Sequence, residues 1–393
     1  MRPIRSVALA LLAPVVLAGT LTGCQSSREQ TAAGDIVIAA DLELSGAMAD
    51  LGKTYQRALE LKVEQINESG ALGGRKIRLE VRDNRSDPSE SLRNINDFTG
   101  NPAVQAIIMG RCIECVTGSA KTITDARVPT IALAPASEVA SPVAERKYLF
   151  KLGPNAADNA AALAAELRRQ KTKSVAVLYT DDSYGREGLA AVTAELEKAG
   201  IRLRGSQRVK VTDTDLSQPV RRLVYDEPDA FLVWTTAEQA MVATKEAHDL
   251  GYQGQMYFDA GTADKLFLPN EVTAAAEGAL MVFTQTMVID DVIANTPAKA
   301  SRKQWFRDFT SRYGSYAGYS SMAADAVQLI VDAVLRSGVD QPSRDLIRDV
   351  LETLHLDGLS GPIRMTPDNH SGLMPQALTM LVVRSGRWRL ASS

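Results

Sequence analysis

The sequence predicts an α/β protein made of two successive halves. Short apolar runs alternate with segments of helical periodicity along most of the chain, and this alternation is typical of parallel sheets with right-handed crossovers. The pattern begins again after residue 152, and 393 residues exceed the length of one average domain. We therefore expect two domains of the same class.

Each expected strand of the first half is a short apolar run that ends in a polar or glycine-containing turn. Such runs lie at 36–40, 77–81, 104–109 and 128–133. Helices are expected at 53–68, at 89–98 and from the end of the third run to about residue 126. The first helix carries apolar residues on one face at helical spacing: Tyr55, Leu59, Val63 and Ile66.

The second half repeats this alternation and ends differently. Strands are expected at 174–179, 201–209, 230–234, 256–258 and 279–285. Helices are expected at 156–168, 186–199, 216–224, 237–250, 302–313, 320–335 and 343–354. The last two strand-like segments, 377–383 and 388–390, are joined at Ser385-Gly386, which predicts a hairpin at the edge of a largely parallel sheet.

The loop after the 104–109 strand is a candidate ligand site. In open α/β sheets the carboxyl end of a strand faces a crevice, and backbone N–H groups at the next helix N-terminus point into it. Those donors and the helix dipole favour a carboxylate. The residues in that place are Glu114, Cys115, Val116 and Thr117. An ordinary strand-to-helix loop is the alternative.

The N-terminus is typical of a targeting segment. Arg2 and Arg5 precede an apolar stretch at 7–18 that is short for a bilayer span. Leu21-Thr22-Gly23 then precedes Cys24, an arrangement that resembles a bacterial lipoprotein signal. We expect a signal peptide at 1–23, lipidation at Cys24 and a flexible tether at 24–35. An ordinary secretory signal and an uncleaved anchor are the alternatives.

The remaining two cysteines, Cys112 and Cys115, stand three residues apart. In an oxidising compartment a local disulfide that stiffens the loop is the favoured interpretation. A redox dithiol is a second possibility. A zinc site is the least favoured, because the chain has no second Cys or His pair, and we expect no metal.

Composition excludes some partners and activities. A net charge of -3 and the lack of a basic stripe argue against a nucleic-acid partner. The sequence contains no Gly-x-Ser-x-Gly elbow, no P-loop and no His-Glu-x-x-His motif. We therefore expect no enzymatic activity and no cofactor.

Five ordered motifs follow one another along the chain: the segment Leu44 to Gly52, the stretch from Glu64 to Arg75, the turn Asp83 to Pro88, the segment Asp182 to Gly185, and Gly358 to Ile363. In order and spacing they resemble the branched-chain amino acid receptors of ABC transporters, which have the type I periplasmic-binding fold. The resemblance implies two doubly wound, mostly parallel lobes with a hinge and an interlobe cleft. Lobe one would comprise 36–153 and 286–357, and lobe two 154–285 and 358–393.

The resemblance also implies a function. The chain would be an extracytoplasmic, lipid-anchored and monomeric protein that captures a small solute between its lobes. The solute would be an amino acid or a related amide or carboxylate, and the partner would be an ABC permease in the membrane. The alternative is a lipid-anchored ligand-sensing module that is not coupled to transport.

The ligand-binding residues carried over from the family lie on loops of both lobes. They are Ser45, Glu114, Cys115, Ala136, Ser137, Glu138, Tyr184, Trp234, Thr235, Asp259 and Gly261. Two positions depart from the family pattern. Glu114 stands where a small hydroxyl residue is usual, and Gly261 stands where a carboxylate usually holds the α-amino group. Asp259 or Asp264 could replace that acid.

Overall fold

The computed structural model describes residues 34–391 except residue 267. The expected signal peptide at 1–23, the lipidation site Cys24 and nearly all of the tether at 24–35 lie outside these residues. No helix within the described range combines the length and the apolar character that a bilayer span requires.

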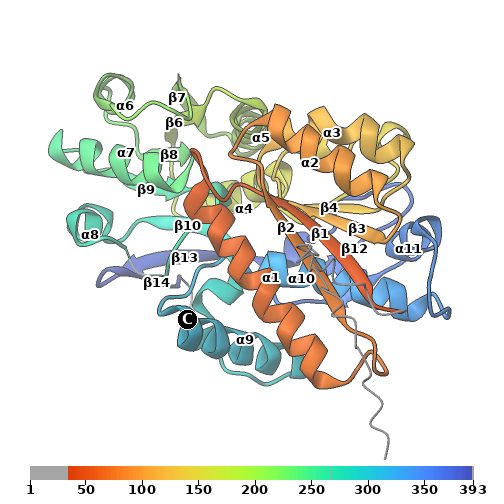
Figure 1. The fold of residues 1–393 in the computed structure, drawn as a ribbon. Coiled ribbons are helices and arrows are strands. Elements are labelled where there is room, and N and C mark those ends of the chain that lie inside the picture. The colour runs from red at the N-terminus through yellow and green to blue at the C-terminus, as the bar shows by residue number, and fades with distance from the viewer. Residues whose placement is uncertain (1–33, 267, 392–393) are drawn as a thin grey trace, which may run out of the picture. The chain divides into compact units, whose positions relative to one another are not determined.

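The first sheet is entirely parallel and has five strands in the order β2-β1-β3-β4-β5. Strands β1, β2, β3 and β4 are labelled in Figure 1. Its strands are β1 (Ile36–Leu42), β2 (Ile77–Asp83), β3 (Val104–Met109), β4 (Thr130–Ala132) and β5 (Leu149–Lys151). Strand β3 lies between β1 and β4, so the loop that follows it starts from the middle of the sheet.

The second sheet has seven strands in the order β14-β13-β10-β9-β8-β6-β7. Its strands are β6 (Ser174–Thr180), β7 (Arg202–Val209), β8 (Ala230–Trp234), β9 (Gln255–Phe258), β10 (Leu280–Thr284), β13 (Leu378–Arg384) and β14 (Arg387–Leu390). Strand β13 pairs antiparallel with both of its neighbours, β10 and β14, and the remaining pairs are parallel. The predicted terminal hairpin at the sheet edge is confirmed.

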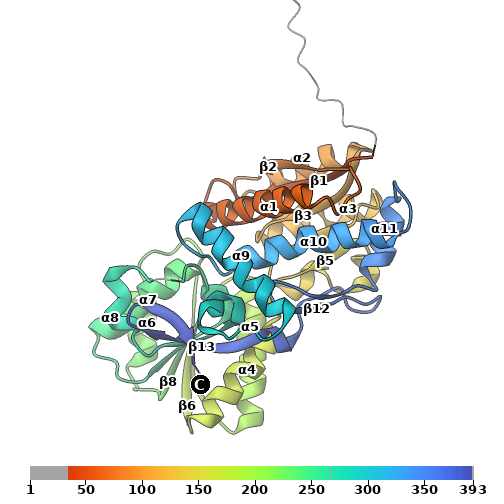
Figure 2. The same cartoon turned by 90° about the horizontal axis from the view of Figure 1, so that it is seen from below.

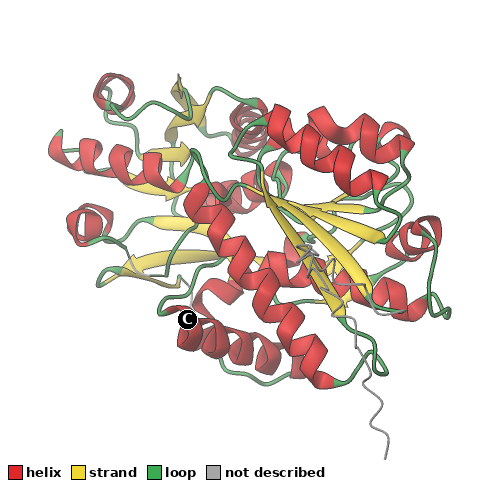
Figure 3. Cartoon of the chain, in the orientation of Figure 1, coloured by secondary structure: helices red, strands yellow, loops and turns green. Residues whose placement is uncertain are grey.

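Helices flank both sheets (Figure 3). They are α1 (Ala49–Ser69), α2 (Pro88–Gly100), α3 (Ile113–Asp125), α4 (Ala156–Arg169), α5 (Ser183–Ala199), α6 (Ser217–Val224), α7 (Ala237–Asp249), α8 (Asn270–Ala276), α9 (Pro297–Tyr313), α10 (Ser320–Arg336) and α11 (Arg344–Leu351). Short 3-10 turns are η1 (Ser137–Val139), η2 (Val143–Glu145), η3 (Ala260–Thr262), η4 (Gln285–Asp291) and η5 (Pro375–Ala377).

Alternation along the strands explains why each sheet is covered on two faces. In β1, Ile36 and Ile38 pack in the same apolar cluster as Tyr55 of α1 and residues of α10, whereas Val37 packs with α2 and α3. Successive strand residues point to opposite faces, so a strand that is apolar throughout needs helices on both sides. Figure 2 shows α1 and α10 side by side. The predicted α/β class with two doubly wound sheets is confirmed.

Three details differ from the sequence prediction. Helix α1 begins at Ala49 rather than at residue 53, because Gly52 fits inside its first turns against the backbone of Glu43. A Cβ at Gly52 would lie 2.0 Å from the Glu43 carbonyl oxygen. Helix α8 was not predicted. The predicted helix at 343–354 ends at Leu351, and the chain continues into a hairpin of β11 (His355–Asp357) and β12 (Pro362–Arg364).

The packing of α5 on β8 generates a first prediction. The Trp234 side chain is fully buried, and a Cβ at Gly188 would lie 2.2 Å from its ring. We expect Gly188→Ala to lower the free energy of unfolding by about 1–3 kcal/mol, as overpacked core sites do. Gly118→Ala on α3 is the control, since nothing lies within 4 Å of the added Cβ. Urea denaturation that found both variants equally stable would contradict this packing.

Candidate functional site

A cavity of about 580 Å³ is lined by residues from both sheets. Its wall consists mainly of residues that follow the carboxyl ends of strands and of residues in the first turns of helices. From the five-stranded side come Met48, Leu51, Arg111, Ile113 and Glu114. From the seven-stranded side come Thr180, Asp182, Tyr184, Thr236, Phe258 and Gly261, among others. This is the edge at which open α/β sheets build ligand sites.

The backbone donors before α3 are occupied by the chain itself. The fully buried carboxylate of Glu43 accepts hydrogen bonds from the Cys112 N–H at 2.8 Å and the Arg111 N–H at 3.2 Å. The Cys115 N–H donates a hydrogen bond to the Cys112 sulfur. These bonds occupy the N–H groups of Arg111, Cys112 and Cys115, so those three donors are not offered to a ligand. Burial raises the pKa of Glu43, and the two backbone donors oppose that rise.

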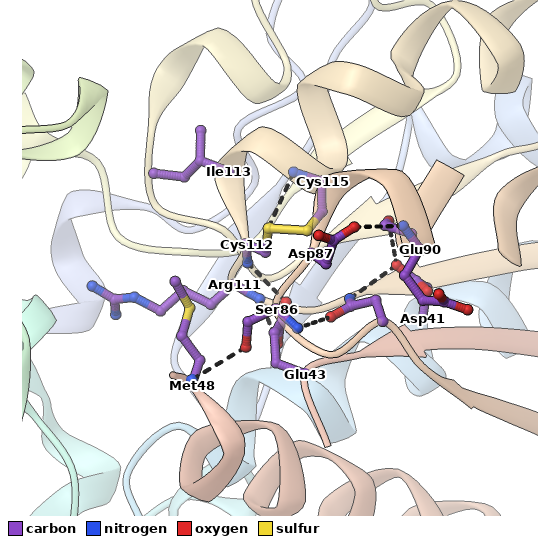
Figure 4. Close-up of a disulfide and its surroundings, with 12 residues drawn as sticks. Asp41, Glu43, Met48, Ser86, Asp87, Glu90, Arg111, Cys112, Ile113 and Cys115 are labelled. Atoms are coloured by element: carbon purple, nitrogen blue, oxygen red, sulfur yellow. Dashed lines mark hydrogen bonds between the residues drawn. A yellow bond between two sulfur atoms is a disulfide. The ribbon is translucent and has the colours of Figure 1, made fainter. Parts of the chain in front are cut away.

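Cys112 and Cys115 form a disulfide at the first turn of α3 (Figure 4). Both cysteines are buried, at 3% and 1% exposure. Their sulfur atoms therefore face the apolar core rather than the cavity. The disulfide that the cysteine spacing favoured is present in the structure, and its place next to Glu43 fixes the backbone from which Arg111 projects.

Arg111 turns its side chain away from the disulfide (Figure 4) and into the cavity wall. The residue is 9% exposed. Its Nη1 donates a hydrogen bond of 3.2 Å to the Tyr319 hydroxyl, and the Tyr319 hydroxyl donates to the Ala260 carbonyl at 2.8 Å. The guanidinium carbon lies 5.2 Å from the ring centroid of Tyr184 and 5.8 Å from that of Tyr319. Cation–π attraction to two rings stabilises this position.

Asp259 lies behind the cavity wall in a polar network. Its carboxyl group is hydrogen-bonded to the Tyr184 hydroxyl and accepts the Gly261 N–H at 2.7 Å. The residue is fully buried. Burial raises its pKa to about 8, against the opposing effects of the Gly261 N–H and the Arg111 charge. The Asp259 carboxyl group is therefore largely protonated at neutral pH.

Acidic side chains predominate elsewhere on the wall. Burial raises the pKa of Glu238 and of Asp264, and the charge of Asp50 contributes to both shifts. Asp50 and Glu238 are exposed, and Asp264 is half-buried. Two lysines, Lys210 and Lys265, also line the cavity and are exposed. Among the charged wall residues that the structure describes, Arg111 alone is buried.

The structure brings three of the eleven residues expected to bind ligand to the cavity wall: Glu114, Tyr184 and Gly261. Five others are buried in the layers behind it: Cys115, Ala136, Trp234, Thr235 and Asp259. The remaining three are exposed and do not line the cavity: Ser45, Ser137 and Glu138. Ser45 is bonded to Asp83. The Ser137 N–H donates a hydrogen bond of 2.9 Å to the carboxylate of Glu187 in α5. This bond connects η1 to the seven-stranded side.

Sequence reasoning missed Arg111. It stands between Gly110, which ends the β3 run, and Cys112, and it belongs to no motif of its own. The available signal was a single basic residue in the loop at the carboxyl end of a largely buried strand. A charge at that place has to face the crevice or find a partner.

Comparisons with known proteins agree with this geometry. A family model described as periplasmic binding protein matches residues 35–387. The Leu/Ile/Val-binding protein homolog 7 of Brucella abortus is 24% identical over 326 residues, which cover 77% of each chain.

Two solved structures share the fold. A leucine-binding protein LivK from Thermotoga maritima has a TM-score of 0.78 at 19% identity and covers 91% of this chain and 98% of its own. A solute-binding protein of an ABC transporter from R. palustris, in complex with 4-hydroxybenzoate, has a TM-score of 0.79 at 16% identity, with 91% and 96% covered. The chain therefore has the type I periplasmic-binding fold.

The raised pKa of Asp259 predicts a pH dependence of stability. Between its ordinary value of 3.8 and about 8, folded Asp259 holds a proton that the unfolded chain has lost, so its contribution makes stability fall as pH rises. Asp259→Asn keeps a similar shape and cannot ionise. We expect the melting temperature of Asp259→Asn to rise relative to that of the wild type as the pH increases from 5 to 8.

Differential scanning calorimetry at several pH values measures this gain. Asp249→Asn, at an exposed carboxylate whose pKa is lowered by Lys245, is the control and should show no such gain. Parallel pH profiles for the wild type and Asp259→Asn would show that Asp259 is already ionised in the folded protein.

Proposed function

Because the chain belongs to the periplasmic binding protein family, we propose that it captures a small solute in the cavity between its sheets and delivers it to an ABC importer. Membership of this family implies that the protein binds a solute for an ABC transporter and that it is located outside the cytoplasm. The identity of the solute, the lipid anchor and the importer are the proposed part.

The observation that carries the proposal is the cavity of about 580 Å³. Its volume lies within the range of about 300–1,000 Å³ that is usual for small-molecule sites. The cavity wall is apolar at Met48, Leu51 and Ile113 on the five-stranded side. It is also apolar at Tyr184 and Phe258 on the seven-stranded side. Because both sheets contribute to the wall, a bound solute would touch both and favour their approach.

The proposed solute is an amino acid or a related amide or carboxylate. Two similarities support this class. The Brucella relative is named for leucine, isoleucine and valine, and the R. palustris structure holds 4-hydroxybenzoate. The apolar wall residues fit the hydrocarbon part of such solutes. We propose Tyr184 as the aromatic contact, because it lines the cavity and is 4% exposed.

We further propose that the two lobes move as units about a hinge. Lobe one comprises 36–153 and 286–357, and lobe two 154–285 and 358–393. The hydrogen bonds from Ser137 to Glu187 and from Tyr319 to Ala260 connect these units next to the cavity. Closure of such hinges buries ligand and forms a new outer surface, which the permease would recognise. The protein acts as a monomer carried by a lipid on Cys24.

Solute binding is tested first by thermal unfolding of the purified protein with a panel of amino acids, amides and aromatic acids. A ligand at 100 times its dissociation constant should stabilise the protein by about 2.7 kcal/mol. Tyr184→Ala should weaken binding about tenfold or more, since aromatic anchors commonly contribute more than 1 kcal/mol. Tyr225→Ala is the control, because that ring is 82% exposed and lies outside the cavity wall.

Failure of every solute to raise the melting temperature would reject the receptor function. If a ligand is found, its uptake by cells that lack the gene separates the two roles. Lost uptake supports import, whereas unchanged uptake indicates a sensing module.

The lipid anchor gives a separate prediction. Cells supplied with a labelled fatty acid should label the wild-type protein on Cys24, and Cys24→Ser should abolish the label. A Cys112→Ser variant should keep it, because Cys112 is buried in the disulfide. Label that persists in Cys24→Ser, measured by gel fluorography, would refute the lipoprotein assignment.

A further inference from the structure

We propose that Arg111 is the anion-binding residue of the cavity and that the solute presents a single carboxylate to it. This inference rests on the proposed function and narrows it, because neutral amides would then be excluded. It also assigns the carboxylate to a side chain, because the N–H groups of Arg111, Cys112 and Cys115 near the start of α3 are already bonded to Glu43 and to the Cys112 sulfur.

The geometry leaves part of the guanidinium group unused. Arginine has five N–H donors in a planar fork, and Arg111 uses Nη1 for the bond to Tyr319. Within the described part of the chain, Nε and Nη2 have no hydrogen-bond partner, and no carboxylate forms an ion pair with Arg111. The rings of Tyr184 and Tyr319 flank the group. Donors on the edge of a flanked guanidinium suit a planar carboxylate, which can accept two parallel bonds.

The charge of Arg111 also lacks a strong counterion. A buried cation is costly unless it is paired. The groups whose negative charge would act on the guanidinium are Tyr319, Tyr55 and Asp259. Burial raises the pKa of both tyrosines and raises that of the carboxylic acid, Asp259, to about 8. Near neutral pH this acid is mostly uncharged. A ligand carboxylate would supply the missing negative charge, in a place where solvent screens the interaction weakly.

The rest of the wall limits the solute to one anionic group. Asp50, Glu114 and Glu238 are exposed at the cavity and would repel a second carboxylate. The exposed cations on the wall are Lys210 and Lys265, and water screens them as it screens the exposed carboxylates. The exposed carboxylates, which also include Asp181, outnumber these two lysines, so the net effect of the exposed charges disfavours a second carboxylate. The solute class is therefore a monocarboxylate whose remaining part is neutral or positively charged.

The test measures binding of matched pairs that differ only in the anionic group. The pairs are benzoate and benzamide, 4-hydroxybenzoate and 4-hydroxybenzamide, and leucine and leucinamide, measured by calorimetry and thermal shift on the full chain. Wild type should bind at least one acid and prefer it to its amide. Arg111→Gln should lower the affinity for that acid about 100-fold, which corresponds to the loss of a buried charge pair. Arg111→Lys should lower the affinity less.

Arg344→Gln is the matched control. Arg344 is half-buried and donates to the carbonyls of Val104 and Asn101, away from the cavity. This control should lower the melting temperature without changing the affinity for the acid, so it separates lost stability from lost binding. If Arg111→Gln does not fold, two measurements still test the role of Arg111: the preference of the wild type for the acid over its amide, and the affinity of Arg111→Lys for the acid.

Three outcomes are decisive. An acid that Arg111→Gln binds as tightly as the wild type does would overturn the assignment of Arg111. A wild type that prefers amides, or binds only neutral or cationic solutes from the wider panel, would also overturn it while leaving the receptor function intact. A wild type that binds no solute at all would reject the receptor function, and the anion site with it.

Discussion

The site depends on the buried carboxylate of Glu43. This side chain comes from the loop after β1 and accepts the N–H groups of Arg111 and Cys112 just before α3. Burying a carboxyl group is costly. The two backbone N–H bonds and the positive end of the α3 dipole reduce that cost, but burial outweighs them and raises the pKa of Glu43. The neighbouring backbone has to approach closely. A Cβ at Gly110 would lie 2.1 Å from the Glu43 carboxylate, and one at Gly52 would lie 2.0 Å from the Glu43 carbonyl. Glu43 therefore holds β1, α1 and the β3–α3 loop in one arrangement.

This arrangement determines how the cavity can recognise charge. Glu43 takes up two backbone donors of the kind that an α/β crevice commonly offers to an anion, and the proposed anion site is accordingly a side chain. Arg111 starts from the backbone that Glu43 and the disulfide fix, and its guanidinium group reaches the wall between Tyr184 and Tyr319. The carboxyl group next to the start of α3 is thus the chain's own Glu43, and the buried cation Arg111 lines the cavity.

The sequence predicted the layers of the fold better than the contents of the site. Most strands and helices were predictable because apolar runs such as 104–109 and the periodicity from Tyr55 to Ile66 are local signals. Glu43 could not be found in this way, because its partners Arg111 and Cys112 lie 68 and 69 residues further along the chain. Trp234 illustrates the same difficulty. A tryptophan at the end of a strand can either contact a ligand or belong to the core. Trp234 is fully buried and packs closely against Gly188, 46 residues earlier in the chain, which the local sequence does not reveal.

The same long-range contacts connect ligand recognition to the approach of the two sheets. Arg111 belongs to the five-stranded side, Tyr184 to α5 on the other side, and Tyr319 donates to Ala260 next to β9. A solute carboxylate at Arg111 would therefore meet a residue whose neighbours come from both sides of the cavity. Any separation of the sheets would remove the Tyr184 ring from the guanidinium group and expose the charge to water, where pairing is weaker. In the proposed function, affinity for the anion and closure of the cavity would therefore be one equilibrium, and residues that stabilise closure without touching the solute would change its affinity.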